Sequence, residues 1–228
     1  MNARTPERVR FSRPGGLAIT DRAVALCSFS PGDAVLDVGC GMGESVRHLR
    51  DCLGLSALGV DSDEKAVAQA LRAGRGGEFL AADAGALPFA DASQEGVFFE
   101  CSLSKMVDPD TALAEAFRVL RPRGRLVVSD FFARADRGAR ERETCFTGVL
   151  GRLDALGTWQ LRVGAAGFEL LHREDFTDAL RETWGQLVFD YGLERILAEP
   201  GFDAEALSGV RCGYFLAVAQ KGQVTVRP

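Results

Sequence analysis

The stretch Ala34-Val-Leu-Asp37-Val-Gly-Cys-Gly-Met-Gly43 decides the fold of this chain. Its apolar start is typical of a buried parallel strand, and its alternating glycines predict a turn where a ligand can approach the backbone. Apolar residues at Val46, Leu49 and Leu53 predict a helix from Glu44 to Leu53. A strand, a glycine-rich turn and a helix in this order indicate an open α/β sheet, whose ligands bind at the carboxyl ends of the strands.

The charges around this turn indicate the kind of ligand it accepts. The spacing G-x-G-x-G differs from the G-x-G-x-x-G of dinucleotide sites, and Glu44 stands where the last glycine of that pattern would fall. A carboxylate there would repel a diphosphate. Asp37 adds a second acid just before the glycines. The turn therefore favours a cofactor with positive charge and no phosphate, and S-adenosylmethionine, with its sulfonium and ammonium groups, meets that description.

Further predicted elements extend this sheet. They are the strands Ala57–Asp61, Glu78–Asp83, Gly96–Glu100 and Leu126–Asp130, with a helix Asp110–Leu120 before the last of them. An acid at the end of the second strand can accept hydrogen bonds from ribose hydroxyls. Because parallel strands end at one edge of a sheet, we expect Asp37, Asp61 and Asp83 to converge there.

At this point the chain resembles the class I S-adenosylmethionine-dependent methyltransferases. The residues that carry the resemblance are Val35–Gly43, Gly59–Asp61, Ala82–Ala84 with Leu87–Phe89, and Arg118–Pro122. The resemblance implies an α/β, Rossmann-like, seven-stranded and mostly parallel sheet with helices on both faces and an antiparallel last strand. It also implies a single domain over residues 1–228: an N-terminal cap helix in 1–30, a cofactor-binding half in 31–130, and acceptor-side cover segments 131–157 and 176–211.

The resemblance further assigns residues to the cofactor, S-adenosylmethionine. They are Asp37, Gly39, Cys40, Gly41, Gly43, Asp61, Ser62, Asp83, Ala84, Glu100 and Cys101. The acid and the glycines of the first turn would hold the methionine part. Asp61 would bind the ribose hydroxyls, Asp83 with Ala84 the adenine edge, and Glu100 and Cys101 would border the methyl group.

Two arginines lie at the margins of these motifs. A helix with Thr20 as its N-cap and running through Cys27 would close over the cofactor, and Arg13 would approach the cofactor carboxylate or lie in a surface turn. Arg123 stands where the family usually has glycine. We expect it to matter little, because it lies away from the cofactor edge.

The second half of the chain supplies the cover segments. Thr158 is expected to cap a helix Trp159–Ala166 that ends at Gly167, followed by strands Phe168–His172 and Gly213–Ala219. Residues 176–210 show the spacing of an amphipathic helix. Loops on a rigid scaffold commonly carry specificity, so acceptor recognition is expected in these segments.

Three residues of the cover segments are candidates for acceptor binding. Trp184 and Tyr191 either line an apolar pocket or pack the cover helix onto the sheet. The segment from Cys145 to Leu150 resembles one in arsenite methyltransferases, where a cysteine binds arsenic as a thiolate. Similar segments occur in methyltransferases that act on quinone precursors. The six cysteines form no C-x-x-C pair, so packing is the favoured role of Cys145, and no metal site is expected.

Three functions follow from this sequence. The first is in-line methyl transfer to a small-molecule acceptor, the second is arsenite methylation through Cys145, and the third is cofactor binding without catalysis. A NAD-dependent reductase is disfavoured by Glu44. The two histidines, His48 and His172, are expected to be structural or exposed, so no catalytic base is assigned.

Composition limits the possible partners. The chain has 228 residues and a net charge of -5, which argues against nucleic acid. No apolar run approaches the ~18 residues of a membrane helix, so no membrane insertion is expected. We expect a cytoplasmic protein with reduced thiols. The sequence sets no oligomeric state.

Overall fold

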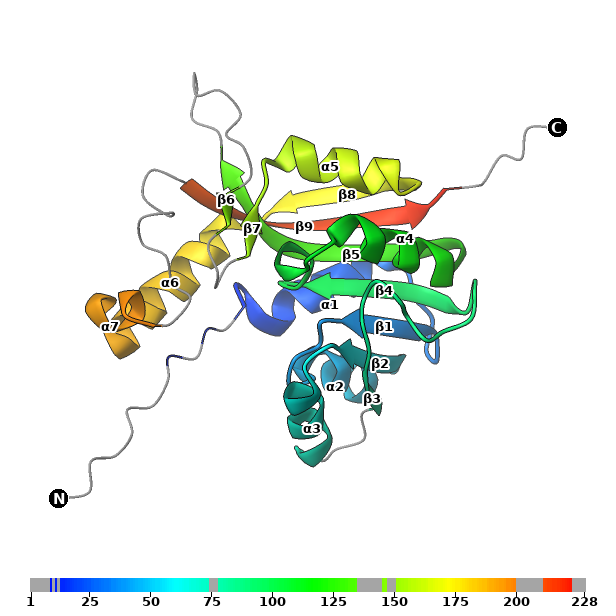
Figure 1. Ribbon diagram of the computed structural model, residues 1–228, viewed down its shortest axis with the longest axis horizontal. Coiled ribbons are helices and arrows are strands. Elements are labelled where there is room, and N and C mark those ends of the chain that lie inside the picture. Colours follow the sequence, from blue (N-terminus) through cyan, green and yellow to red (C-terminus); the bar gives the residue numbers. More distant parts are fainter. Residues whose placement is uncertain are drawn as a thin grey trace.

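The computed structural model describes residues 9, 11, 13–73, 78–134, 145–146 (backbone only), 151–199 and 211–222. In this part of the chain, seven strands form one sheet in the order β3-β2-β1-β4-β5-β9-β8 (Figure 1). The strands are β1 (Ala34–Val38), β2 (Ser56–Asp61), β3 (Glu78–Ala81), β4 (Gln94–Glu100), β5 (Leu120–Arg134), β8 (Phe168–Asp175) and β9 (Arg211–Lys221). The first five pair in parallel, and β9 runs antiparallel to both β5 and β8. The predicted Rossmann-like sheet, including its antiparallel last strand beside the fifth, is confirmed.

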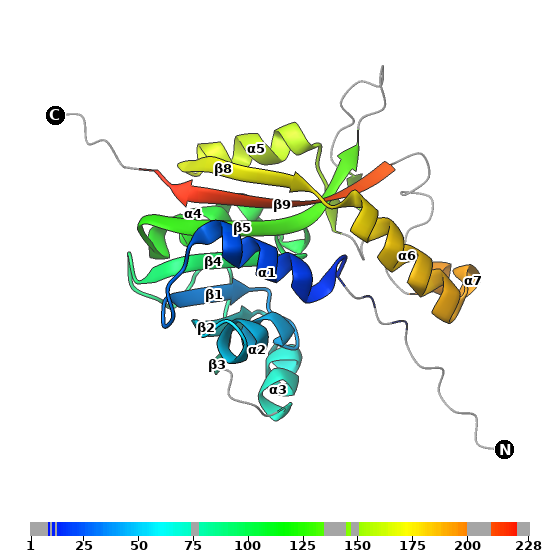
Figure 2. The same ribbon diagram turned by 180° about the vertical axis from the view of Figure 1, so that it is seen from behind.

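Helices cover both faces of this sheet. They are α1 (Gly16–Cys27), α2 (Glu44–Asp51), α3 (Glu64–Arg72), α4 (Pro109–Val119), α5 (Leu156–Ala165), α6 (Thr177–Tyr191) and α7 (Leu193–Leu197), with the 3-10 turn η1 (Leu103–Lys105). α4 and α5 lie on the face seen in Figure 1, and α1 and α2 on the face seen in Figure 2. A two-stranded sheet of β6 (Cys145–Phe146) and β7 (Arg152–Leu153) lies near the end of β5.

Alternation along β1 determines where its acid points. Leu36 and Val38 pack in the core beneath α4 and α5, and Val35 packs in the core beneath α1 and α2. Because side chains alternate between the faces of a strand, Asp37 lies on the same side as Val35. The acid is therefore buried between the sheet and α1, at 2% exposure.

The structure corrects the predicted starts of two helices. Thr20 does not cap α1, which begins at Gly16; Thr20 is buried inside the helix. Thr158 does not cap α5, which begins at Leu156 after Ala155. Gly167 follows α5 with a φ of +94°, which confirms the predicted glycine stop.

Other boundaries also differ from the prediction. α2 ends at Asp51 rather than Leu53, and α3 was not predicted. β5 continues to Arg134, because β9 pairs with it as far as Arg211. Residues 131–134, expected in a cover segment, are therefore strand. No helix in the described residues is both long enough and apolar enough to cross a bilayer.

Candidate functional site

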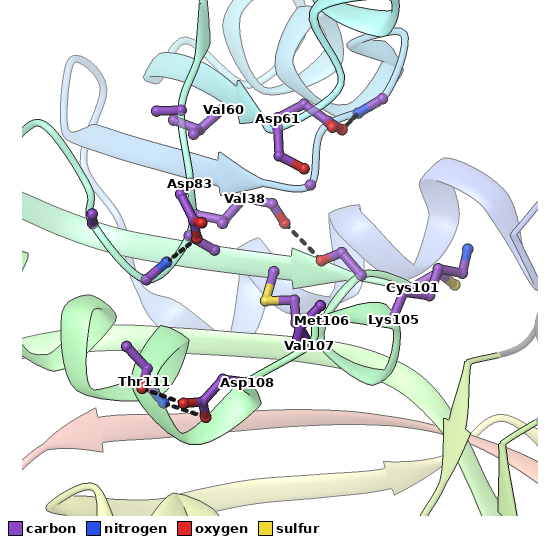
Figure 3. Close-up of a pocket in the computed structure, with 18 residues that line it drawn as sticks. Val38, Val60, Asp61, Asp83, Cys101, Lys105, Met106, Val107, Asp108 and Thr111 are labelled. Carbon is purple, nitrogen blue, oxygen red and sulfur yellow. Dashed lines mark hydrogen bonds between the residues drawn. The ribbon is translucent and has the colours of Figure 1, made fainter.

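The turn after β1 opens onto a cleft of about 700 Å³ at the carboxyl ends of the parallel strands (Figure 3). The backbone N–H groups of Gly39 and Cys40 donate to Val60 O at 2.7 and 3.1 Å, which fixes the turn against β2. Gly39, Gly41 and Gly43 all have positive φ. A Cβ on Gly41 would meet no atom within 4 Å, so this glycine leaves the backbone open to the cleft.

Asp61 ends β2 and faces the same cleft. Its Oδ2 accepts a hydrogen bond from Gly41 N at 2.8 Å, and its Oδ1 accepts one from Asp63 N at 2.9 Å. These bonds fix the carboxylate in the cleft, and each oxygen keeps acceptor capacity for a ligand hydroxyl. Ser62, the next residue, also lines the cleft.

Asp83 follows β3 and lines the other end of the cleft (Figure 3). Its Oδ1 accepts a hydrogen bond from Gly85 N at 2.7 Å, which holds the loop after β3 in a tight turn. Ala84 and Ala86 form part of the same wall. The structure thus brings Asp61 and Asp83 to one cleft beside Gly41, whereas Asp37, which was expected to converge with them, is buried behind the turn and is absent from the described lining of the cleft.

A buried polar cluster lies behind the turn. Glu100 accepts hydrogen bonds from Thr20 Oγ1 at 2.8 Å, from Ser45 Oγ at 2.6 Å and from Arg13 Nη1. Glu100 is placed in this cluster and is absent from the described lining of the cleft. Burial, and then the charge of Glu100, raise the pKa of Asp37, whereas Arg13 acts in the opposite direction.

Arg13 has spare hydrogen-bonding capacity in this cluster. Its Nη1 donates to Ser45 Oγ at 2.8 Å and to Glu100, but its Nε and Nη2 are buried without a partner among the described residues. A buried guanidinium donor without an acceptor is costly, so these two groups point to a missing acceptor. Thr20 and Ser45 complete the cluster. Nothing in the sequence around these two residues predicted their contact with Glu100.

Cys101 lies at the end of β4 with a φ of +53°, an uncommon conformation for a residue with a side chain. It lines the cleft, and its Sγ lies 3.0 Å from the Tyr214 hydroxyl. Burial raises the pKa of the Cys101 thiol to about 12. The thiol is therefore neutral at physiological pH.

The loop after β4 supplies a wall of the cleft that sequence reasoning missed. Its lining residues are Ser102, Lys105, Met106, Val107, Asp108 and, from α4, Thr111 (Figure 3). The signal was their position directly after a strand that ends at the ligand edge of the sheet. Among the lining residues that the structure describes, Lys105 carries the only basic side chain.

Several predicted residues lie elsewhere. Cys40 packs in the core near Gly59, and Gly43 lies against the Phe79 ring. Trp184 and Tyr191 pack around Leu187 and Ile196 in the cluster formed by α6 and α7, away from the described lining of the cleft. The Cys145 backbone pairs with Leu153 in the small sheet; its side chain lies outside the described residues.

Neither histidine of the chain is among the described residues that line the cleft. His48 contacts Asp21 on the surface of α1 and α2, and His172 is exposed on β8. No group of three or more metal-ligating side chains occurs among residues the structure describes.

Comparison with known proteins identifies the segment that carries the cleft. Residues 36–128 match a protein-family model described as a methyltransferase domain. The parallel sheet, the glycine turn with Asp61 and this match together identify that segment as a methyltransferase domain of the class I fold.

Individual relatives agree with this assignment. The chain is 30% identical over 176 residues to 27-O-demethylrifamycin SV methyltransferase of Amycolatopsis mediterranei, a match that covers 73% of this chain and 65% of that protein. Other relatives are O-methyltransferases by name. The chain spans less than two thirds of the length of the first curated relatives it matches.

Two solved structures are similar over most of the chain. The [4+2]-cyclase SpnF superposes with a TM-score of 0.72 and 25% identity, covering 90% of this chain and 80% of that one. Phosphoethanolamine N-methyltransferase 2 of Haemonchus contortus, solved with S-adenosyl-L-methionine, gives a TM-score of 0.73 at 18% identity and covers 92% and 54%. The second likeness concerns the fold alone.

Proposed function

We propose that this protein transfers a methyl group from S-adenosylmethionine to an oxygen atom of a small-molecule acceptor. The observation that carries the proposal is the Gly41 turn bonded to Asp61 at the lip of a cleft, with Arg13 buried behind it. The relatives that are O-methyltransferases by name support oxygen as the accepting atom.

The residues present fit this cofactor at three points. Asp61 keeps acceptor capacity toward the cleft for the ribose hydroxyls. The unpartnered Nε and Nη2 of Arg13 would donate to the cofactor carboxylate. The open space at Gly41 leaves room for the methionine part, and the loop at Asp83 and Ala84 would hold the adenine.

The chain's own contribution to the chemistry is orientation. The bound cofactor supplies a methyl group on a positively charged sulfur, so its leaving group is already activated. The cleft holds the acceptor in line with that methyl group and excludes water, and such orientation lowers a barrier by on the order of 7–11 kcal/mol. Cys101 would border the methyl group as a neutral thiol.

Calorimetry with S-adenosylhomocysteine tests the cofactor. We expect binding to the parent protein, and weaker binding to Asp61→Ala because the ribose hydrogen bonds are lost. Arg13→Met should weaken binding as well, and Arg181→Met, an exposed arginine on α6, is the matched control. Binding of NADH in place of S-adenosylhomocysteine would favour a reductase instead.

Arsenite as the acceptor stays a prediction that depends on Cys145. If arsenite is methylated, Cys145→Ser should abolish methylarsenic formation and leave the affinity for S-adenosylhomocysteine unchanged. We propose the opposite outcome, retained turnover with a modest loss of stability, because the chain offers no ligand spacing for a soft metal.

Cofactor binding without methyl transfer is the third possibility, since a fold does not establish a reaction. The similarity to SpnF, described as a [4+2]-cyclase, is in keeping with this reservation. Incubation with cofactor labelled on the methyl group and a small-metabolite extract should yield labelled small molecules. Binding without any transfer of label would contradict the proposed reaction.

We also propose the domain arrangement and location expected from the sequence. Residues 31–130 would form the cofactor-binding half, and residues 131–157 and 176–211 the acceptor side. Cys27, Cys40, Cys52 and Cys101 are free thiols, which agrees with a reducing, cytoplasmic location.

A further inference from the structure

The charge of the cleft changes from one end to the other. Asp61 and Asp83 line the end that we assign to the cofactor. Lys105 extends beside Cys101 on the side of the cleft away from Asp83 (Figure 3). One basic side chain among the described lining residues therefore stands where the acceptor would approach the methyl group.

The backbone that carries Lys105 is firmly held. Ser104 donates to buried Asp130 from its N and from its Oγ, each at 2.8 Å, and Lys105 N donates to Ser102 O at 3.0 Å. Gly151 packs on the same turn, since a Cβ there would lie 2.6 Å from Ser104 O. Side chains on such a fixed turn are positioned before any ligand binds.

The charge of the Lys105 ammonium group acts on buried Asp130, where it opposes the rise in pKa caused by burial. The ammonium group forms no salt bridge within the described part of the chain. Its neighbours on the lining are Met106 and Val107, of which Val107 is 97% exposed. The acceptor end of the cleft therefore combines an apolar surface with one available positive charge.

A base for a neutral hydroxyl is missing from the same surface. No histidine occurs among the lining residues that the structure describes. Asp108 caps α4 by accepting from Asp110 N, Thr111 N and Thr111 Oγ1. Cys101 is a neutral thiol, because burial raises its pKa to about 12. An acceptor oxygen that attacks a methyl carbon must nevertheless be free of its proton or lose it.

We propose that Lys105 holds the acceptor oxygen as an oxyanion, and that the acceptor is an acidic hydroxyl of the phenol or enol class on an apolar framework. This inference rests on the proposed O-methylation. The proton leaves the hydroxyl to water on binding. The oxyanion then forms a bond to the methyl carbon while the carbon–sulfur bond breaks, and that electron pair remains on sulfur. The products are a neutral ether and a neutral thioether.

Electrostatics make this role effective. An opposite charge within about 4–6 Å lowers the pKa of an acid by about 1–3 units. The titratable groups of the described residues on which the charge of Lys105 acts are Cys101, at the end of β4, and Asp130 of β5. The thiol is neutral, and the Asp130 carboxyl accepts its described hydrogen bonds from Ser104 and Phe131, so the donors of the Lys105 ammonium remain available to a ligand.

The probe for this inference is 4-nitrophenol, whose absorbance reports its own ionisation without any turnover. It is titrated with pH in the presence of the parent protein saturated with S-adenosylhomocysteine. We expect the apparent pKa of 4-nitrophenol to fall by about one unit on binding. Such a fall means that the phenolate binds about tenfold more tightly than the neutral phenol. Lys105→Met should remove this shift, and Lys105→Arg should keep most of it.

Controls separate this inference from the proposed function. Lys65→Met removes an exposed lysine on α3 and should leave the shift unchanged. S-adenosylhomocysteine binding, measured by calorimetry on each variant, shows that the fold and the cofactor site are intact. Loss of that binding in the parent would refute the proposed function. Intact cofactor binding with no bound 4-nitrophenol, or with a shift that survives in Lys105→Met, would overturn the role of Lys105 alone.

Discussion

The three glycines of the turn after β1 differ in what a side chain would meet there. A Cβ on Gly41 would enter open space at the cleft, whereas a Cβ on Gly43 would lie 2.2 Å from the Phe79 ring. On Gly39 it would lie 2.4 Å from the Ser102 Cβ. Gly41 therefore leaves space open at the cleft, whereas a side chain at Gly39 or Gly43 would collide with a neighbouring side chain.

We expect Gly41→Ala and Gly43→Ala to fail in different ways. Both place a side chain at positive φ, which costs roughly 1–2 kcal/mol. Gly43→Ala should lose roughly 1–3 kcal/mol more through overpacking. Gly41→Ala should instead weaken S-adenosylhomocysteine binding by more than its loss of stability explains. Urea unfolding and calorimetry on both variants check this, and equal affinities would contradict it.

Arg123 shows the reverse situation, a side chain where glycine would be less strained. Its φ is +66°, at the position where the resembled family has glycine. Arg123→Gly should relieve a backbone strain of roughly 1–2 kcal/mol in the folded state. The glycine also makes the unfolded chain more flexible, which opposes this gain by roughly 0.5–1 kcal/mol. We expect a net gain of up to about 1 kcal/mol in urea unfolding. Arg121→Gly, which breaks an ion pair with Glu95, is the control and should be destabilising.

At the scale of elements, η1 depends on β5 through one carboxylate. Asp130 is 1% exposed and accepts from Ser104 N, Ser104 Oγ and Phe131 N. Burial raises the pKa of Asp130. The turn that carries Lys105 is thus tied to the end of the fifth strand.

Asp130→Asn should loosen η1 without disturbing the cofactor. The amide keeps the shape of the side chain but turns donors toward donors, at a cost of about 1–3 kcal/mol in unfolding free energy. Hydrogen exchange should accelerate at residues 103–106, while S-adenosylhomocysteine affinity stays constant. Asp91→Asn, an exposed partner of Arg118, should change stability by less than about 0.5 kcal/mol. Unchanged exchange in Asp130→Asn would refute this tie.

The elements that the sequence predicted well are those with continuous apolar runs. β1, β2 and β4 are buried in the middle of the sheet, where hydrophobic burial alone decides the structure. The predictions that Thr20 and Thr158 cap helices were wrong for the same reason, because threonine also occurs inside helices. Thr20 does so to bond Glu100 across 80 residues of sequence, a contact that local pattern does not contain.

The site follows the same division. Gly41, Asp61 and Asp83 were predictable, because strand ends of a parallel sheet meet at one edge. Lys105 and Met106 were missed, although they follow a strand that ends at the same edge, because the 3-10 turn of three residues that leads to Met106 has no periodicity to detect. Trp184 and Tyr191 were assigned from aromatic character alone, and the structure places them in the cluster of α6 and α7.

At the scale of the whole molecule, carboxylates with shifted pKa values contribute to the dependence of stability on pH. Burial raises the pKa of Asp37, so its folded form binds protons more tightly than its unfolded form. Its contribution to stability is therefore fully present below about pH 3.9 and is lost as the pH rises through the raised pKa. Glu115 and Glu174 have lowered pKa values and contribute in the opposite direction, losing stability as the pH falls.

Asp37→Asn isolates the first of these effects. Relative to the parent, the variant should gain stability as the pH rises from 4 into the neutral range. The expected gain is about 1 kcal/mol or more, since one unit of pKa shift is equivalent to 1.36 kcal/mol. Urea unfolding at a series of pH values measures the difference. A difference independent of pH would show that Asp37 titrates normally.

The short outer strand β3 forms an exposed side of the cleft. It has four residues, bonds to β2 along one edge, and is largely exposed, yet it leads directly to Asp83. Its amides should exchange with solvent faster than those of the inner strands, because local opening there disrupts few contacts. A ligand that contacts both Asp61 and Asp83 would suppress the local opening of β3 from β2. Its affinity then includes the free energy of ordering this edge strand, so cofactor affinity and amide protection at Phe79–Ala81 should decline together along a urea series.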